Sequence, residues 1–229
     1  MIYRRECSIQ APPRCCSAPR SRTGAAYKAN SEKFKFKPDE LDYVFVGHSH
    51  IDHIGLLPRL IKEGFHGKII MTYPSSVMSK YLLLNCAFIV NDEARVLSKR
   101  YNREYEPLYT EEDVYTLDYI YVYNEYNHVY KLDDVVSFQW FKNSHCVGAA
   151  QLQLILNDGI KTKKILYTSD IGALDTKNHY VENTEIPTTC SDVSIMESTY
   201  GLNTRTTKKT REFDIEHLRV AIETVLERQ

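Results

Sequence analysis

The stretch that decides the fold reads His48-Ser-His50-Ile-Asp52-His53, and it places three imidazoles and one carboxylate within six positions. Neutral imidazoles and carboxylates bind divalent first-row metals in hydrolytic sites, where a metal-bound water loses its proton near neutral pH. A histidine-rich surface loop is the alternative, but apolar residues flank this stretch on both sides. We therefore interpret residues 48–53, called the hexad below, as a metal-binding segment.

A loop that leaves the end of a β-strand is the local structure that the hexad predicts. Three of its ligand-type residues alternate and His53 breaks the alternation, so neither a helix nor a plain strand would gather all four side chains. The preceding residues 43–46 form an apolar, β-rich run, and Gly47 marks its end. We expect the hexad at the carboxyl edge of a sheet, where open α/β sheets bind ligands.

Two later motifs complete a pattern that resembles a known family. Residues 143–149 carry His145 ahead of Gly-Ala, and residues 167–172 carry Asp170 at the end of an apolar run. With the hexad, these motifs resemble those of the metallo-β-lactamase superfamily. The resemblance implies an α/β fold, the αββα sandwich, in which two mixed sheets pack between outer helices.

The strand patterns beside these motifs agree with that placement. Apolar residues largely alternate with polar ones over residues 136–140 and again over residues 152–156. Such alternation predicts half-buried strands. These strands would deliver His145 and Asp170 to the same sheet edge as the hexad.

A motif near the end of the chain narrows the resemblance. Residues 194–201 read Ser-Ile-Met-Glu-Ser-Thr-Tyr-Gly, with the acid at Glu197. They resemble the strand-end acidic motif of the β-CASP branch, whose members cleave nucleic acids, mostly RNA, and include the messenger-RNA 3′-end processing nuclease. The resemblance runs from about Lys37 to the C-terminus, with weaker agreement over residues 65–74.

The resemblance implies a site for two divalent metal ions, for which we expect zinc. It assigns His48, His50 and His145 to one metal. It assigns Asp52 and His53 to the other metal, and Asp170 to a bridging position between the two.

Two acids have implied catalytic roles. A hydroxide held between the metals would attack a phosphorus, and Asp52 could orient that hydroxide. Glu197 would not ligate metal; paired with a histidine, it would help to protonate the leaving oxygen. The alternative for Glu197 is a strand-end acid that caps the amides of residues 198 and 199.

The N-terminal residues 1–37 do not match the family's opening strands. They contain nine Lys or Arg against two acids, and their Pro and Ser content leaves little to bury. We expect a basic, disordered leader over residues 1–37 and a partial catalytic domain over residues 38–229. A basic arm that contacts phosphates is the alternative for the leader.

The C-terminal residues also differ from the family pattern. Residues 211–229 predict an amphipathic helix where the family continues into an inserted cassette and a final histidine ligand. We interpret His179 and His217 as surface histidines, so the last ligand and the partner of Glu197 have no counterpart. The expected fold is therefore incomplete, without its opening strands and its C-terminal half.

Composition limits the possible number of domains, membrane contact and cellular location. A chain of 229 residues with 43% hydrophobic residues and a net charge of −1 fits one globular domain, or one and a piece, and gives no signal of nucleic-acid binding. No apolar run approaches the roughly 20 residues that cross a bilayer, so we expect no membrane contact. The six cysteines lack CxxC spacing, which favours a reducing, cytoplasmic location, and we expect Cys146 to pack rather than to bind metal.

Nine tyrosines fall between residues 101 and 130. Tyrosine rings can stack on unpaired bases, at about 1–3 kcal/mol per base. We favour the alternative that they pack around a helix that begins at Thr110 and a strand over residues 119–123.

The resemblance implies a metal-dependent hydrolase that cleaves RNA phosphodiester bonds. Two alternatives stay open: a small-molecule ester or thioester hydrolase of the same superfamily, and a non-catalytic truncated fragment. RNA is the expected substrate, and a dimer or a larger complex is left open.

Overall fold

The computed structural model describes residues 2–3, 25–117, 120–123, 125–174, 181, 183–188, 190–199 and 208–227. The chain divides into two compact units, Met1–Glu197 and Ser198–Gln229. Most of the predicted leader, His179, and the Tyr200–Gly201 end of the acidic motif lie outside the described residues.

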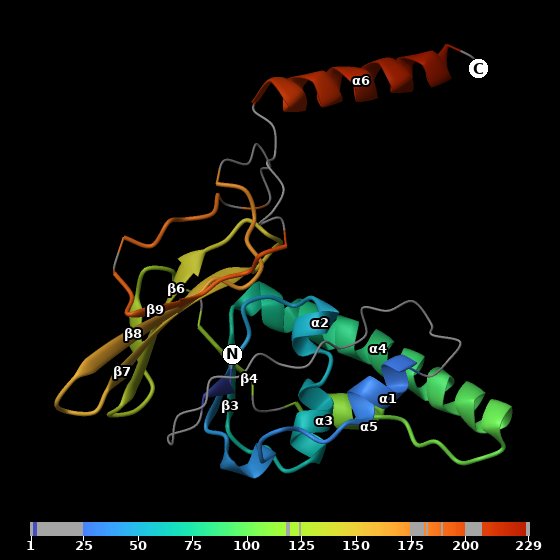
Figure 1. The fold of residues 1–229 in the computed structure, drawn as a ribbon, viewed down its shortest axis with the longest axis vertical. Helices are drawn as coiled ribbons and strands as arrows, with labels where there is room; N and C mark the ends of the chain where they lie inside the picture. The colour runs from blue at the N-terminus through green and yellow to red at the C-terminus, as the bar shows by residue number, and fades with distance from the viewer. Residues whose placement is uncertain are drawn as a thin grey trace. The chain divides into compact units, whose positions relative to one another are not determined.

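The described strands of the first unit form two sheets (Figure 1). The four-stranded sheet has the order β1-β2-β3-β4, with the strands Ile2–Tyr3, Tyr43–Phe45, Lys68–Met71 and Ile120–Val122. The five-stranded sheet has the order β5-β6-β7-β8-β9, with the strands Val129–Lys131, Val136–Lys142, Ala150–Asn157, Thr162–Tyr167 and Val193–Ile195. Both sheets are mixed: β2, β3 and β4 run parallel, and β9 runs parallel to β8, whereas the other pairs are antiparallel.

Helices connect the parallel strands of the first sheet, because parallel neighbours need a crossover. The described helices are α1 Ala25–Ser31, the 3-10 helix η1 Pro38–Glu40, α2 Ile51–Ile54, α3 Leu57–Lys62, α4 Tyr73–Tyr101, α5 Glu111–Tyr115 and α6 Lys208–Leu226. The long helix α4 buries one stripe that includes Leu83, Ala87 and Val90. It ends at Asn102, whose φ of 47° gives a left-handed cap.

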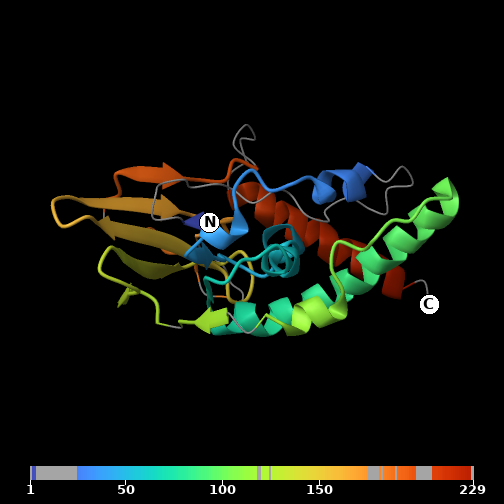
Figure 2. The ribbon, with the colours of Figure 1, turned by 90° about the horizontal axis from the view of Figure 1, so that it is seen from below.

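The strand β2 shows how two apolar layers are built. Val44 packs in a core shared with the helices α2 to α5, whereas Tyr43 and Phe45 pack in a core between the two sheets. Alternate side chains of a strand point to opposite faces, so a wholly apolar strand suits a sheet that is covered on both sides. Figure 2 shows the two sheets and the helices α1 to α5 of the first unit from a second direction. The α/β fold class is thus confirmed.

The second sheet confirms one strand prediction and modifies the other. In β6, Val136, Phe138 and Trp140 are buried and alternate with half-buried residues, as predicted. In β7, Gln153 is buried, although the alternation predicted a half-buried strand with Gln153 on its polar face, and the preceding Gln151 is buried as well. The difference arises because Glu185 and Ser191, which lie between β8 and β9, supply hydrogen-bond partners for these amides.

Those partners come from backbone and side chain alike. The Gln151 amide donates to the carbonyl oxygen of Glu185 at 2.7 Å, and the Gln153 amide donates to Ser191 Oγ at 3.0 Å. Buried amides are tolerated where such partners exist.

Residues 27–37 differ from the predicted disordered leader because they pack on the domain. The buried Arg59 guanidinium donates to the carbonyl oxygens of Asn30 and Glu32, and Phe34 and Phe36 pack against the helical core. Residues 4–24 lie outside the part of the chain that the structure describes.

The tyrosine-rich region largely follows the packing interpretation. Helix α5 begins after Thr110, which forms a capping box with Asp113, and β4 lies within the predicted strand, although Tyr119 is outside the described residues. Tyr109 is fully buried, whereas Tyr101 and Tyr115 are exposed.

The second unit contains α6, which confirms the predicted C-terminal helix and begins at Lys208. Its apolar side chains, among them Leu218 and Ile222, are exposed, as is His217. Among the helices of the described residues, none is long and apolar enough to cross a membrane.

Candidate metal centre

Three loops meet at one edge of the two sheets. They follow β2, β6 and β8, and they carry the hexad, His145 and Asp170. Because β6 and β8 both run antiparallel to β7, their carboxyl ends share an edge. The amide of Ala150 donates to the carbonyl oxygen of Gly47 at 2.7 Å and joins the two sheets there.

The hexad is a loop followed by one helical turn. His50 has an extended backbone as the N-cap of α2, and Asp52 and His53 lie within that turn. The prediction of a loop is therefore right up to His50 and incomplete beyond it. Ile54 is fully buried and anchors the turn in the helical core.

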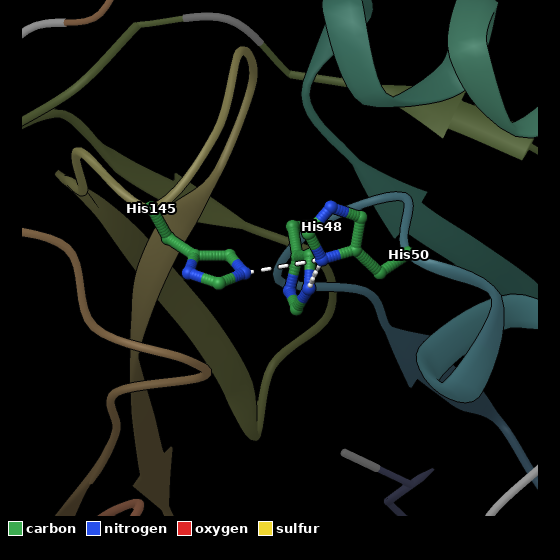
Figure 3. A group of neighbouring side chains, drawn as sticks. All are labelled: His48, His50 and His145. Atoms are coloured by element: carbon green, nitrogen blue, oxygen red, sulfur yellow. Dashed lines mark hydrogen bonds between the residues drawn. The ribbon is translucent and has the colours of Figure 1, made fainter. Parts of the chain in front are cut away.

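Three histidines point their ring nitrogens toward one another (Figure 3). His48 Nε2 lies 2.9 Å from His50 Nδ1, and His145 Nε2 lies 3.1 Å from the same His50 nitrogen. Two imidazoles on one tetrahedral zinc ion have nitrogens about 3.3 Å apart, given metal–nitrogen bonds of about 2.0–2.1 Å. The spacing of these nitrogens therefore fits a single metal ion.

Asp170 lies between this group and a second one. Its Oδ2 is 3.8 Å from His48 Nε2 and 3.7 Å from His145 Nε2, whereas its Oδ1 is 3.4 Å from His53 Nε2. His48, His53 and Asp170 form the second group of ligand atoms that could hold a metal. Asp52 lies beside this group, with Oδ2 3.7 Å from His53 Nε2.

Burial keeps the central imidazole neutral. Desolvation, followed by the neighbouring His53, His50 and His145, lowers the pKa of His48 from 6.5 to about 2. The pKa of His53 is also lowered by burial, against the opposing effect of the Asp170 and Asp52 charges. A neutral imidazole keeps a lone pair for a metal, so this donor set fits a divalent cation.

Beside His48, Ser169 was not singled out from the sequence, and Gly47 was predicted only to mark the end of a strand. Ser169 Oγ lies 3.0 Å from His48 Nδ1, and Ser169 has a positive φ of 56°. A Cβ atom on Gly47 would overlap the Ser169 side chain, so only glycine allows this approach. The positions of Gly47 at a strand end and of Ser169 next to Asp170 were the available signals.

Glu197 follows β9 and contacts the loop that carries Asp170. Its Oε1 accepts a hydrogen bond from the amide of Ile171, and its own amide donates to Thr168 Oγ1 at 3.4 Å. The carboxylate is thus held one residue from Asp170.

Cys146 lies in the turn between β6 and β7, so strand alternation does not set its direction. Burial, and then the charge of Asp170, raises the pKa of its thiol. A thiol with a raised pKa is a poorer source of the thiolate that binds metal.

Comparison with known proteins finds a family model and curated relatives that this chain resembles. Residues 21–97 match the model of the metallo-beta-lactamase superfamily. The chain is 29% identical to the "Endoribonuclease YSH1" of Eremothecium gossypii over 78% of its length, and 31% identical to the "Cleavage and polyadenylation specificity factor 73" of Drosophila melanogaster over 76%. The predicted resemblance to the metallo-β-lactamase superfamily is thus confirmed over residues 21–97, and the similar curated relatives agree with it.

The chain spans about a fifth of these curated relatives, 22% of the first and 23% of the second. A solved metallo-β-lactamase, BJP-1 of Bradyrhizobium japonicum, is 16% identical and aligns over 58% of this chain and 42% of its own, with a TM-score of 0.33. Likeness at that level carries no functional information.

Proposed function

We propose that this chain provides the metal site of a hydrolase that cleaves RNA phosphodiester bonds. The observation that carries the proposal is the convergence of His48, His50 and His145 on one point, with Asp170 between them and His53. A hydrolytic metal site of imidazoles and carboxylates is the chemistry that this donor set suits best.

Two metal ions, proposed to be zinc, would share the site. His48, His50 and His145 would hold one, and His53 with Asp52 would hold the other. The two Asp170 oxygens face the two groups separately, at 3.7–3.8 Å and 3.4 Å, which supports a bridging role for this carboxylate. Imidazole nitrogen is a good ligand for zinc, which is the basis for that choice of metal.

The metal ions would supply Lewis acidity toward a phosphoryl oxygen and a nucleophilic water at neutral pH. Asp52 would orient the attacking water, since its half-exposed carboxylate lies beside His53. Glu197 would help to protonate the leaving oxygen, and its hydrogen bond from Ile171 supports a fixed position near Asp170.

RNA is proposed as the substrate because the relatives named above are an endoribonuclease and a cleavage and polyadenylation factor. A dimer or a larger complex stays open in this proposal. A reducing, cytoplasmic location stays part of the proposal, and the described cysteines Cys86, Cys146 and Cys190 form no disulfide with one another.

The test measures zinc per chain and RNA cleavage for the wild type, His50→Ala and His66→Ala. His66 is an exposed histidine outside the cluster, so its variant is the matched control. We expect close to two zinc ions and cleavage in the wild type and the control, and loss of both in His50→Ala. Cleavage that survives His50→Ala contradicts the proposal. Turnover of a small ester without RNA cleavage favours the esterase alternative, and metal content that ignores the mutation favours a non-catalytic chain.

A further inference from the structure

The buried amide of Asn143 connects the two loops that carry His145 and Asp170. Its Nδ2 donates to the carbonyl oxygens of Asp170 at 2.7 Å and Thr168 at 3.2 Å. Its Oδ1 accepts from the amides of His145 at 3.0 Å and Gly172 at 3.1 Å. A primary amide offers two donors and two principal acceptor sites, so this side chain uses its full hydrogen-bonding capacity here.

The direction of this amide follows from its surroundings. Its nitrogen faces two carbonyl oxygens and its oxygen faces two N–H groups. A flipped amide would replace all four attractions with repulsions, so the bonding pattern allows one orientation. Because Asn143 is buried, water cannot replace bonds that are lost.

The same two loops also pack closely at Ser144 and Gly172. This second contact restricts how far one loop can move relative to the other. A Cβ atom on Gly172 would overlap Ser144, and Ser144 Oγ donates to the carbonyl oxygen of Ala173 at 2.6 Å. The loops are therefore packed backbone to backbone beside the amide. The separation between His145 and Asp170 is set by this packing and by the four hydrogen bonds.

We propose that Asn143 is a positioning residue that fixes the distance between His145 and Asp170 and so sets the metal affinity of the site. This inference rests on the proposed function, because it assumes that both residues bind metal. The amide acts on the ligands only through the backbone: it bonds to the amide of His145 and to the carbonyl of Asp170, and to neither metal-binding side chain.

The test variant is Asn143→Asp, which keeps the size and the acceptor oxygen but aims a carboxylate at the carbonyls of Thr168 and Asp170. The control is Gln153→Glu, the same chemical change at another buried amide, which donates to Ser191. Each protein is titrated with Co²⁺, whose visible absorption reports both affinity and ligand geometry, after circular dichroism has established that it is folded.

We expect Asn143→Asp to bind Co²⁺ 10- to 100-fold more weakly, about the effect of losing an outer-shell partner of a metal ligand, with an altered spectrum. Gln153→Glu should melt at a lower temperature and keep the wild-type affinity and spectrum. Equal affinities for Asn143→Asp and the wild type would overturn the inference while leaving the proposed function intact. Asn143→Ala serves as a second variant, and unfolding of both Asn143 variants beside a folded control also overturns it, because Asn143 would then be a general stability element.

A measurement without metal separates this inference from the proposed function. In the metal-free protein, the amides of His145 and Gly172 should be protected from hydrogen exchange and should lose that protection in Asn143→Ala. Unchanged exchange refutes the positioning role. A wild type that binds no Co²⁺ refutes the proposed function. The exchange result then still tests whether Asn143 holds the loops of His145 and Asp170 together.

Discussion

The two sides of the candidate metal centre are built by different forces. On one side, the hexad holds its ligands within six residues, His48 is fully buried, and Ile54 anchors the segment in the helical core. On the other side, His145 and Asp170 lie 25 residues apart in sequence, and their side chains keep 26% and 32% of their surface exposed. Hydrogen bonds between side chains and backbone hold that second side.

This difference predicts that substitutions on the two sides will have different effects on metal binding and on stability. Apolar packing fixes the hexad, so a change there affects metal binding and the stability of the fold together. Polar contacts fix the loops of His145 and Asp170, so a change there can shift metal affinity with little loss of stability.

The largest effect is expected from the residue that belongs to both ligand groups. His48→Ala removes a proposed ligand of the first metal and, because its ring nitrogen also lies among the atoms of the second group, disturbs that group as well; His145→Ala leaves His48, His53 and Asp170 in place. We expect His48→Ala to lose all bound metal, with an affinity loss beyond the roughly 100-fold that outer-shell changes reach. His145→Ala should keep a fraction of its metal. Elemental analysis of both variants is the measurement. Identical metal contents would show that the two groups of ligand atoms do not bind metal separately.

A steric change at the hexad should affect stability and metal together. In Gly47→Ala the new methyl group overlaps the Ser169 side chain, and overpacking of this kind costs about 1–3 kcal/mol. Gly159→Ala is the control, because its Cβ would meet nothing within 4 Å although its φ is +88°. Thermal melts and Co²⁺ titrations should show both losses in Gly47→Ala and only a stability loss in the control. Full metal affinity in Gly47→Ala would mean that the hexad tolerates the shift.

A polar change in the loop of Asp170 should lower metal affinity without lowering thermal stability. Ser169→Ala removes the hydroxyl beside His48 Nδ1, and we expect roughly tenfold weaker metal binding from the loss of this outer-shell contact. The melting temperature of the metal-free protein should change little. Ser191→Ala, which removes the hydroxyl that Gln153 contacts, is the control and should leave metal affinity unchanged. A melting temperature that falls in step with the affinity would argue against two independently built sides.

The smallest effect is expected at the start of β9. Asp192 accepts hydrogen bonds from the Lys163 ammonium and the Lys164 amide, which hold the pKa of its carboxyl below its usual range. Its contribution to stability is therefore complete above the unfolded-state pKa of about 3.9 and is lost as the pH falls through the lower folded-state value. Asp192→Asn should unfold at slightly lower urea at pH 7, and the difference should shrink below about pH 4. A constant difference across that range would show that the charge is not responsible.

The sequence predicted the parts of the site that depend on local pattern. The apolar run of β2, the alternation of β6 and the cap of α5 each follow from neighbouring residues, and the motifs placed His145 and Asp170 at one edge. The partners of Asn143 and Ser169 could not be foreseen from their positions, because each side chain bonds to a residue that is distant in sequence. Burial of Gln153 likewise depends on Ser191, which lies 38 residues away.

The compactness of the hexad has a consequence for the coupling between metal binding and folding. An unfolded chain still carries three histidines and an aspartate within six positions, so it keeps a weak local site while His145 and Asp170 are far away. A ligand stabilises a fold only by the difference between its affinities for the folded and unfolded chain. The rise in melting temperature on adding zinc should therefore be smaller than the affinity of the folded site implies. Zinc added to the denatured chain should already be bound to the hexad when refolding begins.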